Sequence, residues 1–309
     1  MCTLVWKNLV SFAIVSMSRT GSTSLYRVLR TDPAICIAYE PNFALANLNT
    51  ASVRDRCSDL FAKYSAIKHV WDPMGWPFRN LQYIPTIAHL ERSEELIELN
   101  ATVARFPDKV IFLRRRDQFA RIISDLMGQQ LHFWGHVLSE PFTQSERTQY
   151  REKAKQSEMV PINSKIVEWY MTNAWRQEEA LIERTSRDQR LVVYYEDLFD
   201  HNLWRRQDLS AWIQLTSWVG ARSRLCREYV RNLIAPQDKY NTEEIFEKIP
   251  NYKELVAEFS GTSQKHKEAT RDRAHLLQQL ADRGGDGEDG LKRSVRAGSP
   301  TAERNGRTG

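Results

Sequence analysis

The sequence predicts an α/β fold in which helices flank a central, mainly parallel sheet. Apolar runs of strand length recur near residues 12–15, 66–71, 110–113 and 190–195. Helical patterns alternate with these runs, and such an alternation implies parallel strands joined by crossover helices. Among them we expect a long helix that Asn163 caps and that ends at Glu183, and a helix over residues 212–230. We expect a ligand at the carboxyl ends of the strands.

Composition limits the class of protein. The 309 residues are 41% hydrophobic and 27% charged, which is enough to bury a full core. The net charge of +5 suits an anionic ligand but is too small to indicate nucleic acid. The four cysteines are scattered without metal-ligand spacing, so we expect a reduced, metal-free protein. No apolar run is long enough to span a bilayer, which predicts a soluble, cytoplasmic enzyme. The sequence does not indicate an oligomeric state.

The domain organisation follows from the C-terminal composition. We expect one domain over residues 1–260, followed by a polar, largely disordered tail over residues 261–309. Seven of the chain's 13 glycines fall within the last 26 residues, among charged residues and serines. Such a segment buries too little apolar surface to order itself.

The stretch from Ser11 to Arg30 contains the most informative loop. A buried strand leads through Ser18–Ser24 into a helix. Unpaired backbone N–H groups at a helix start favour anions, and Gly21 lets the backbone approach one closely. Arg19 adds a positive charge. The hydroxyl groups come from Thr20, Ser22, Thr23 and Ser24. The loop therefore predicts a phosphate site, the alternative being an ordinary strand–turn–helix corner capped by serine.

The spacing within this loop indicates which phosphate it binds. It lacks the lysine of a GxxxxGK[ST] nucleotide-hydrolysing loop, and the chain has no GxGxxG motif. Its Ser-x-Arg-Thr-Gly-Ser-Thr arrangement resembles the 5′-phosphosulfate loop of sulfotransferases that use 3′-phosphoadenosine-5′-phosphosulfate (PAPS). The resemblance implies a single P-loop-like domain.

A second stretch, Lys109–Asp117, combines a predicted strand with three arginines and a helix that Asp117 caps. Positive charges at the positive end of a helix are unfavourable, which indicates a bound anion. PAPS-dependent sulfotransferases bind the 3′-phosphate with an arginine at this strand end and a serine two helical turns later. The resemblance assigns Ser124 and either Arg115 or Arg116, and the spacing does not choose between the arginines.

Two further segments extend the resemblance over about residues 10–258. Tyr195-Glu-Asp-Leu198 is similar to a family segment held to be structural and near the nucleotide. Lys239 falls where the family often places a basic residue over the nucleotide. The closest resemblance is to the bacterial carbohydrate branch, of the Nod-factor and trehalose type.

The base that deprotonates the acceptor has two candidates. By resemblance to the bacterial branch it is Glu40, which precedes Pro41 and has the simpler interpretation of a turn residue. By resemblance to animal cytosolic enzymes it is His69, although an isolated histidine in an apolar strand is more often a satisfied core residue.

The resemblance implies transfer of a sulfonate group from PAPS to an acceptor hydroxyl, leaving adenosine 3′,5′-bisphosphate (PAP). Arg19 and the Thr20–Ser24 segment would hold the 5′-phosphate and the transferring sulfonate, without a metal. The branch favours a carbohydrate or carbohydrate-containing acceptor. The alternatives are a small-molecule or nucleoside kinase with a degenerate P-loop, and a non-catalytic nucleotide-binding protein.

Overall fold

The computed structural model describes residues 10–39, 49–71, 93–131, 152, 156–199, 209–222 and 243–261. The chain divides into two units, Met1–Ser263 and Gln264–Gly309, and every described residue belongs to the first. Of the predicted C-terminal tail only Gly261 is described, at the end of a helix, and residues 262–309 lie outside the described residues.

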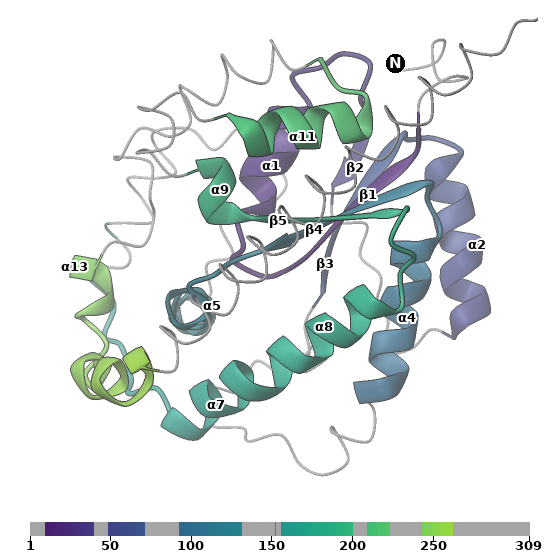
Figure 1. Cartoon of the computed structure of the whole chain (residues 1–309). Coiled ribbons are helices and arrows are strands. Elements are labelled where there is room, and N and C mark those ends of the chain that lie inside the picture. The colour runs from purple at the N-terminus through teal and green to yellow at the C-terminus, as the bar shows by residue number, and fades with distance from the viewer. Residues whose placement is uncertain are drawn as a thin grey trace, which may run out of the picture. The chain divides into compact units, whose positions relative to one another are not determined.

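The described core is an α/β structure built on a five-stranded sheet (Figure 1). The strands are β1 (Phe12–Met17), β2 (Ile37–Tyr39), β3 (Ala66–Trp71), β4 (Lys109–Arg114) and β5 (Arg190–Tyr194). Their order is β2-β3-β1-β4-β5, and all four pairings are parallel. The α/β class and the parallel central sheet are therefore confirmed.

Helices cover both faces of this sheet. The helices of the described residues include α1 (Ser22–Leu29), α2 (Thr50–Phe61), α4 (Ser93–Arg105), α5 (Gln118–Gln130), α7 (Ser164–Trp169), the π-helical η3 (Tyr170–Ala174), α8 (Trp175–Glu183), α9 (Tyr195–Phe199), α11 (Ser210–Val219) and α13 (Glu243–Phe246). Alternate side chains of a strand point to opposite faces, so β1 contributes to two apolar clusters. Phe12 and Ile14 pack with α1 and α11, whereas Ala13 and Val15 pack with the layer of α2, α4, α5, α7 and α8.

The connections place two loops together at the carboxyl edge of the sheet. Strands β1 and β4 are neighbours, but β1 leads into α1 on one face and β4 leads into α5 on the other. Ligands of open parallel sheets bind where neighbouring connections diverge in this way. The two loops that the sequence predicts to bind phosphate are these two.

Several local predictions are confirmed in detail. Asp117 caps α5, since its side chain accepts a hydrogen bond from the backbone N–H of Ala120 at 3.0 Å. Asn163 caps the predicted long helix, accepting from the N–H of Lys165 at 3.0 Å. That helix reaches Glu183 as predicted but includes the π-helical segment η3.

Other boundaries differ from the prediction. The helix expected over residues 212–230 ends at Val219, because Gly220 adopts φ 72°, a left-handed conformation that terminates helices. The strand expected to run from Arg190 through the Tyr-Glu-Asp-Leu segment ends at Tyr194, and that segment instead forms the short helix α9. Strand β2 and helix α2 were not predicted as such.

Candidate functional site

The loop between β1 and α1 has the backbone of an anion-binding turn. Arg19 has φ 58° and Gly21 has φ 86°, both left-handed values, so the chain turns sharply between strand and helix. The Thr20 hydroxyl donates to the carbonyl of Met17 at 2.8 Å and fixes the turn. Among the described residues no side chain caps α1, and its first turn contains no acidic residue. The helix start is therefore suited to an anion.

Gly21 is required here for a second reason. A Cβ atom at this position would lie 2.3 Å from Cδ2 of Tyr195, far inside van der Waals contact. Burial raises the pKa of the Tyr195 phenol, and Arg115 offsets part of that rise. Tyr195, from the third sequence motif, thus packs against the first motif.

Lys68 of β3 supplies a charge that the sequence analysis missed. The residue is fully buried, yet its Nζ donates to Oγ1 of Thr23 at 2.9 Å and lies 4.2 Å from the Tyr39 ring centroid. The Tyr39 hydroxyl lies 3.5 Å from the same Thr23 oxygen. A loop without a lysine of its own therefore receives one from the neighbouring strand. The only sequence signal was a charged residue inside an apolar strand.

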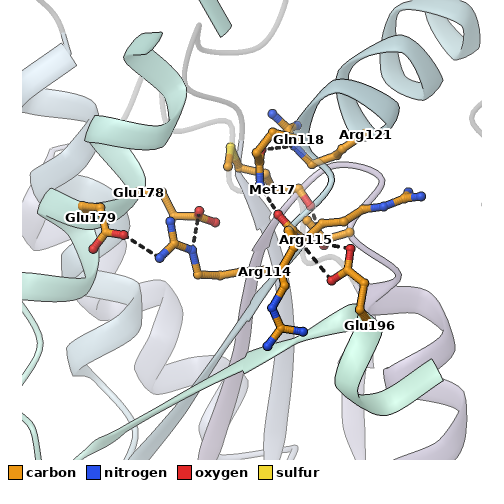
Figure 2. A network of polar contacts seen from close by, with 10 residues as sticks. Met17, Arg114, Arg115, Gln118, Arg121, Glu178, Glu179 and Glu196 are labelled. Carbon is orange, nitrogen blue, oxygen red and sulfur yellow. Dashed lines mark hydrogen bonds and ion pairs between the residues drawn. The ribbon is translucent and has the colours of Figure 1, made fainter. Parts of the chain in front are cut away.

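The loop between β4 and α5 uses its three arginines differently. Arg114 points into the α8 side of the sheet, where Figure 2 shows it between the carboxylates of Glu178 and Glu179. Arg115 turns towards the first loop, and its Nη1 donates to the carbonyl of Arg19 at 3.3 Å. Arg116 forms a bidentate pair with Asp197, at 2.5 and 2.7 Å.

The acidic residues of α9 neutralise this second helix start. The Glu196 carboxylate accepts from the backbone N–H of Arg116 at 3.0 and 3.1 Å and from that of Asp117 at 3.2 Å (Figure 2). Burial alone would lower the pKa of Arg116, but the Asp197 carboxylate outweighs it and the pKa is raised. The arginine cluster was interpreted as evidence for a bound anion. The structure shows that side chains of the protein supply much of that negative charge.

Arg115 differs from its neighbours in its partners. Within the described residues it has no carboxylate partner, and its buried Nε has no hydrogen-bond acceptor. Its guanidinium carbon lies 5.3 Å from the Tyr195 ring centroid. Arg115 is thus a cation beside the β1–α1 loop whose charge the described residues leave unpaired.

The remaining candidates are placed as follows. His69 is buried on the α4 side of the sheet, where its Nε2 lies 2.7 Å from Oδ1 of Asn100, whereas Lys68 next to it faces α1. Ser124 is buried in α5. Arg19 extends to α5, because a Cβ on Gly128 would lie 2.2 Å from its Nη2. Glu40 and Lys239 lie outside the described residues.

The arrangement has hydrogen-bond donors for two anionic groups. The backbone N–H groups at the start of α1 and the Lys68 ammonium group could bind one, and the Arg115 guanidinium group could bind the other. In the described part of the chain, no three His, Cys, Asp or Glu side chains lie together as a metal site would require. Nor does that part contain a helix with the length and apolar composition needed to cross a membrane.

Comparison with known proteins does not assign the chain to a family. No protein-family model matches the chain, and no curated protein matches it. The resemblance to sulfotransferases therefore rests on the three sequence motifs.

Proposed function

We propose that the protein is a PAPS-dependent sulfotransferase. One observation carries the proposal: Arg115 Nη1 contacts the Arg19 carbonyl at 3.3 Å, so the motifs assigned to the 3′- and 5′-phosphates of one nucleotide are adjacent. Tyr195, from the third motif, contacts both loops. Motifs that are 96 residues apart in the chain thus meet at the edge of the sheet where parallel α/β proteins bind ligands.

The residues divide into two anion sites. The backbone and hydroxyl groups of Thr20–Ser24 would hold the 5′-phosphate, and Arg19 remains part of this site in the proposal. Lys68 Nζ, held at Thr23, would place a positive charge beside the transferring group. Arg115 and Ser124 would hold the 3′-phosphate. We favour Arg115 over Arg116, because Asp197 already engages both terminal nitrogens of Arg116.

PAPS supplies the sulfonate group, and the protein's task is to orient it and to stabilise the negative charge that spreads in the transition state. Glu40 remains the proposed base, and it directly follows Tyr39 in the chain. His69 is the weaker candidate, since its ring faces Asn100 on the opposite side of the sheet from Lys68 and Thr23. Lys239 stays a proposed contact, and a carbohydrate-type hydroxyl a proposed acceptor.

Thermal unfolding with nucleotides tests the proposal. PAP should raise the melting temperature clearly, and adenosine 5′-phosphate should raise it much less because it lacks the 3′-phosphate. Equal stabilisation by both nucleotides would contradict the two-anion site. Turnover of labelled PAPS with a panel of carbohydrate acceptors tests the chemistry. A protein that binds PAP but sulfonates no acceptor of the panel would favour a non-catalytic nucleotide-binding protein.

Lys68 favours a second candidate, a small-molecule or nucleoside kinase with a degenerate P-loop. The missing loop lysine is the argument against a kinase, and Lys68 brings an ammonium group to the same loop from β3. The same experiment with ATP and Mg²⁺ separates the two functions. Stabilisation by ATP and Mg²⁺ but not by PAP would replace the sulfotransferase proposal with the kinase.

A further inference from the structure

Two groups of polar contacts meet at the end of β4, one at Arg114 and one at the next residue, Arg115, and together they are called the network below (Figure 2). In the first group, Nε of Arg114 donates to Glu178 at 2.7 Å and Nη1 donates to Glu179 at 2.6 Å. The side chains of Arg114 and Glu178 are each only 3% exposed. The Arg114 guanidinium also lies 3.8 Å from the Trp175 ring centroid, so α8 holds it from several directions.

The second group of polar contacts lies on α5. Arg121 is buried, and its Nε donates to Oε1 of Gln118 at 2.8 Å. The Gln118 amide in turn donates to the backbone carbonyl of Arg115. Burial raises the pKa of the Glu178 carboxyl group, while the positive charges of Arg114 and Arg121 oppose that rise.

This network ends on the residue that the proposed function uses. Arg114, the last residue of β4, is bound to α8 through Glu178. The carbonyl group of the next residue, Arg115, accepts a hydrogen bond from the Gln118 side chain. Arg115 then reaches across to the carbonyl of Arg19. The backbone of Arg115 is thus held on both sides of its Cα atom.

The network places charged side chains at buried positions that apolar side chains could fill. The other residues of β4 that point to this face of the sheet, Val110 and Phe112, are apolar. Burying the Glu178 carboxylate costs free energy that an apolar side chain would not. Buried ion pairs of this kind are weak contributors to stability, and their better attested role is to specify one arrangement.

We infer that Gln118 and Glu178 are positioning residues that hold Arg115 in the orientation needed to bind the 3′-phosphate. The inference rests on the proposed function, and neither residue contacts the nucleotide in it. If the two residues only stabilise the fold, replacing them should change the affinity for PAP and for adenosine 5′-phosphate by the same factor. A positioning role affects the preference for PAP over adenosine 5′-phosphate, because the two nucleotides differ only at the group that Arg115 would bind.

The test is titration calorimetry of both nucleotides with three variants. Gln118→Met keeps the side-chain length but removes both hydrogen bonds, and Glu178→Gln removes the charge. Glu94→Gln is the control, since the Glu94 side chain is 72% exposed and pairs with Arg184, which is not part of the network. Unfolding in denaturant gives the stability of each variant separately.

We expect Gln118→Met and Glu178→Gln to weaken PAP binding about tenfold, or about 1.4 kcal/mol. Binding of adenosine 5′-phosphate should change less than about twofold, and Glu94→Gln should change neither. Loss of stability with an unchanged preference for PAP would overturn the positioning role. If Glu178→Gln does not fold, Gln118→Met decides alone. A parent protein without any preference for PAP would refute the proposed function itself, before the variants are considered.

Discussion

The starts of α1 and α5 follow neighbouring parallel strands and both have arginine in the preceding loop, but their surroundings in the structure are opposite. Among the described residues no side chain caps α1, and Lys68 adds a positive charge next to its first turn. Helix α5 is capped by Asp117, and the Glu196 carboxylate also accepts from the N–H groups that precede it. Only the first helix start is thus arranged for an external anion.

The difference teaches that basic residues before a helix do not by themselves define an anion site. At α5 the deciding residues, Glu196 and Asp197, lie about 80 residues further along the chain. They neutralise the helix start and Arg116 but leave Arg115 without a carboxylate among the described residues. We conclude that the first loop offers backbone groups to a ligand, whereas the second offers one side chain.

The largest expected effect is on the chemical step, through the proposed base Glu40. Glu40→Gln preserves shape and removes basicity, so it should lower kcat by roughly 10²–10⁴-fold. PAP binding should remain intact, because the base does not hold the nucleotide. Steady-state kinetics with an acceptor found by the panel, together with PAP titration, measure the two effects.

His69→Asn is the companion variant. His69 is buried against Asn100, so its replacement should cost stability, about 1–3 kcal/mol, with little effect on kcat. A folded His69→Asn protein that loses turnover, beside a Glu40→Gln protein that keeps it, would reverse the assignment of the base.

A smaller effect is expected from adding a methyl group at Gly21 in the β1–α1 loop. Gly21→Ala must adopt φ 86° and places Cβ 2.3 Å from Tyr195, so it should destabilise the fold by about 1–3 kcal/mol and abolish most PAP binding. Gly220→Ala is the matched control, since Gly220 has φ 72° but no atom within 4 Å of the added Cβ. It should lose about 1 kcal/mol and bind PAP normally. Equal effects of both substitutions on PAP binding would show that the Tyr195 contact is irrelevant to the site.

The smallest expected effect separates the two arginines of the second loop. Arg115→Ala should weaken PAP about tenfold relative to adenosine 5′-phosphate and leave stability unchanged. Arg116→Ala breaks the partly exposed pair with Asp197, so it should cost about 1 kcal/mol of stability or less and leave the PAP preference intact. Calorimetric titration and denaturant unfolding of each variant distinguish the outcomes. The opposite pattern would make Arg116 the ligand and remove the contrast between the two loops.

Local features were predictable from the sequence because neighbouring residues determine them. The apolar, β-branched run at Phe12–Val15 predicted a buried strand, and the caps Asp117 and Asn163 were recognisable by their residue type and place. Helix α2 was missed, although Asn49 caps it and Val53 and Cys57 mark its buried face. Its weak apolar periodicity explains the omission.

Contacts between distant segments could not be predicted in this way. The Lys68–Thr23 hydrogen bond joins residues 45 apart, and the Arg116–Asp197 pair joins residues 81 apart. The first depends on β3 lying beside β1 and the second on β5 lying beside β4, and the strand order arises only when the sheet forms. Spacing within one motif therefore indicated candidate anion ligands, but not which arginine the protein itself engages.

The π-helical segment η3 has a consequence for how this protein tolerates changes of length. Such a segment usually contains one residue more than the continuous α-helix it interrupts. The π turn absorbs that residue, because its five residues rotate the chain about as far as roughly four residues of an α-helix do. Deleting one residue from Tyr170–Ala174 should therefore leave α8 close to its orientation relative to α7, with Glu178 and Glu179 still facing Arg114. In a continuous α-helix the same deletion would turn every later residue by about 100°. The segment η3 is thus a place where this helix can lose a residue without disturbing the contacts that it makes further along.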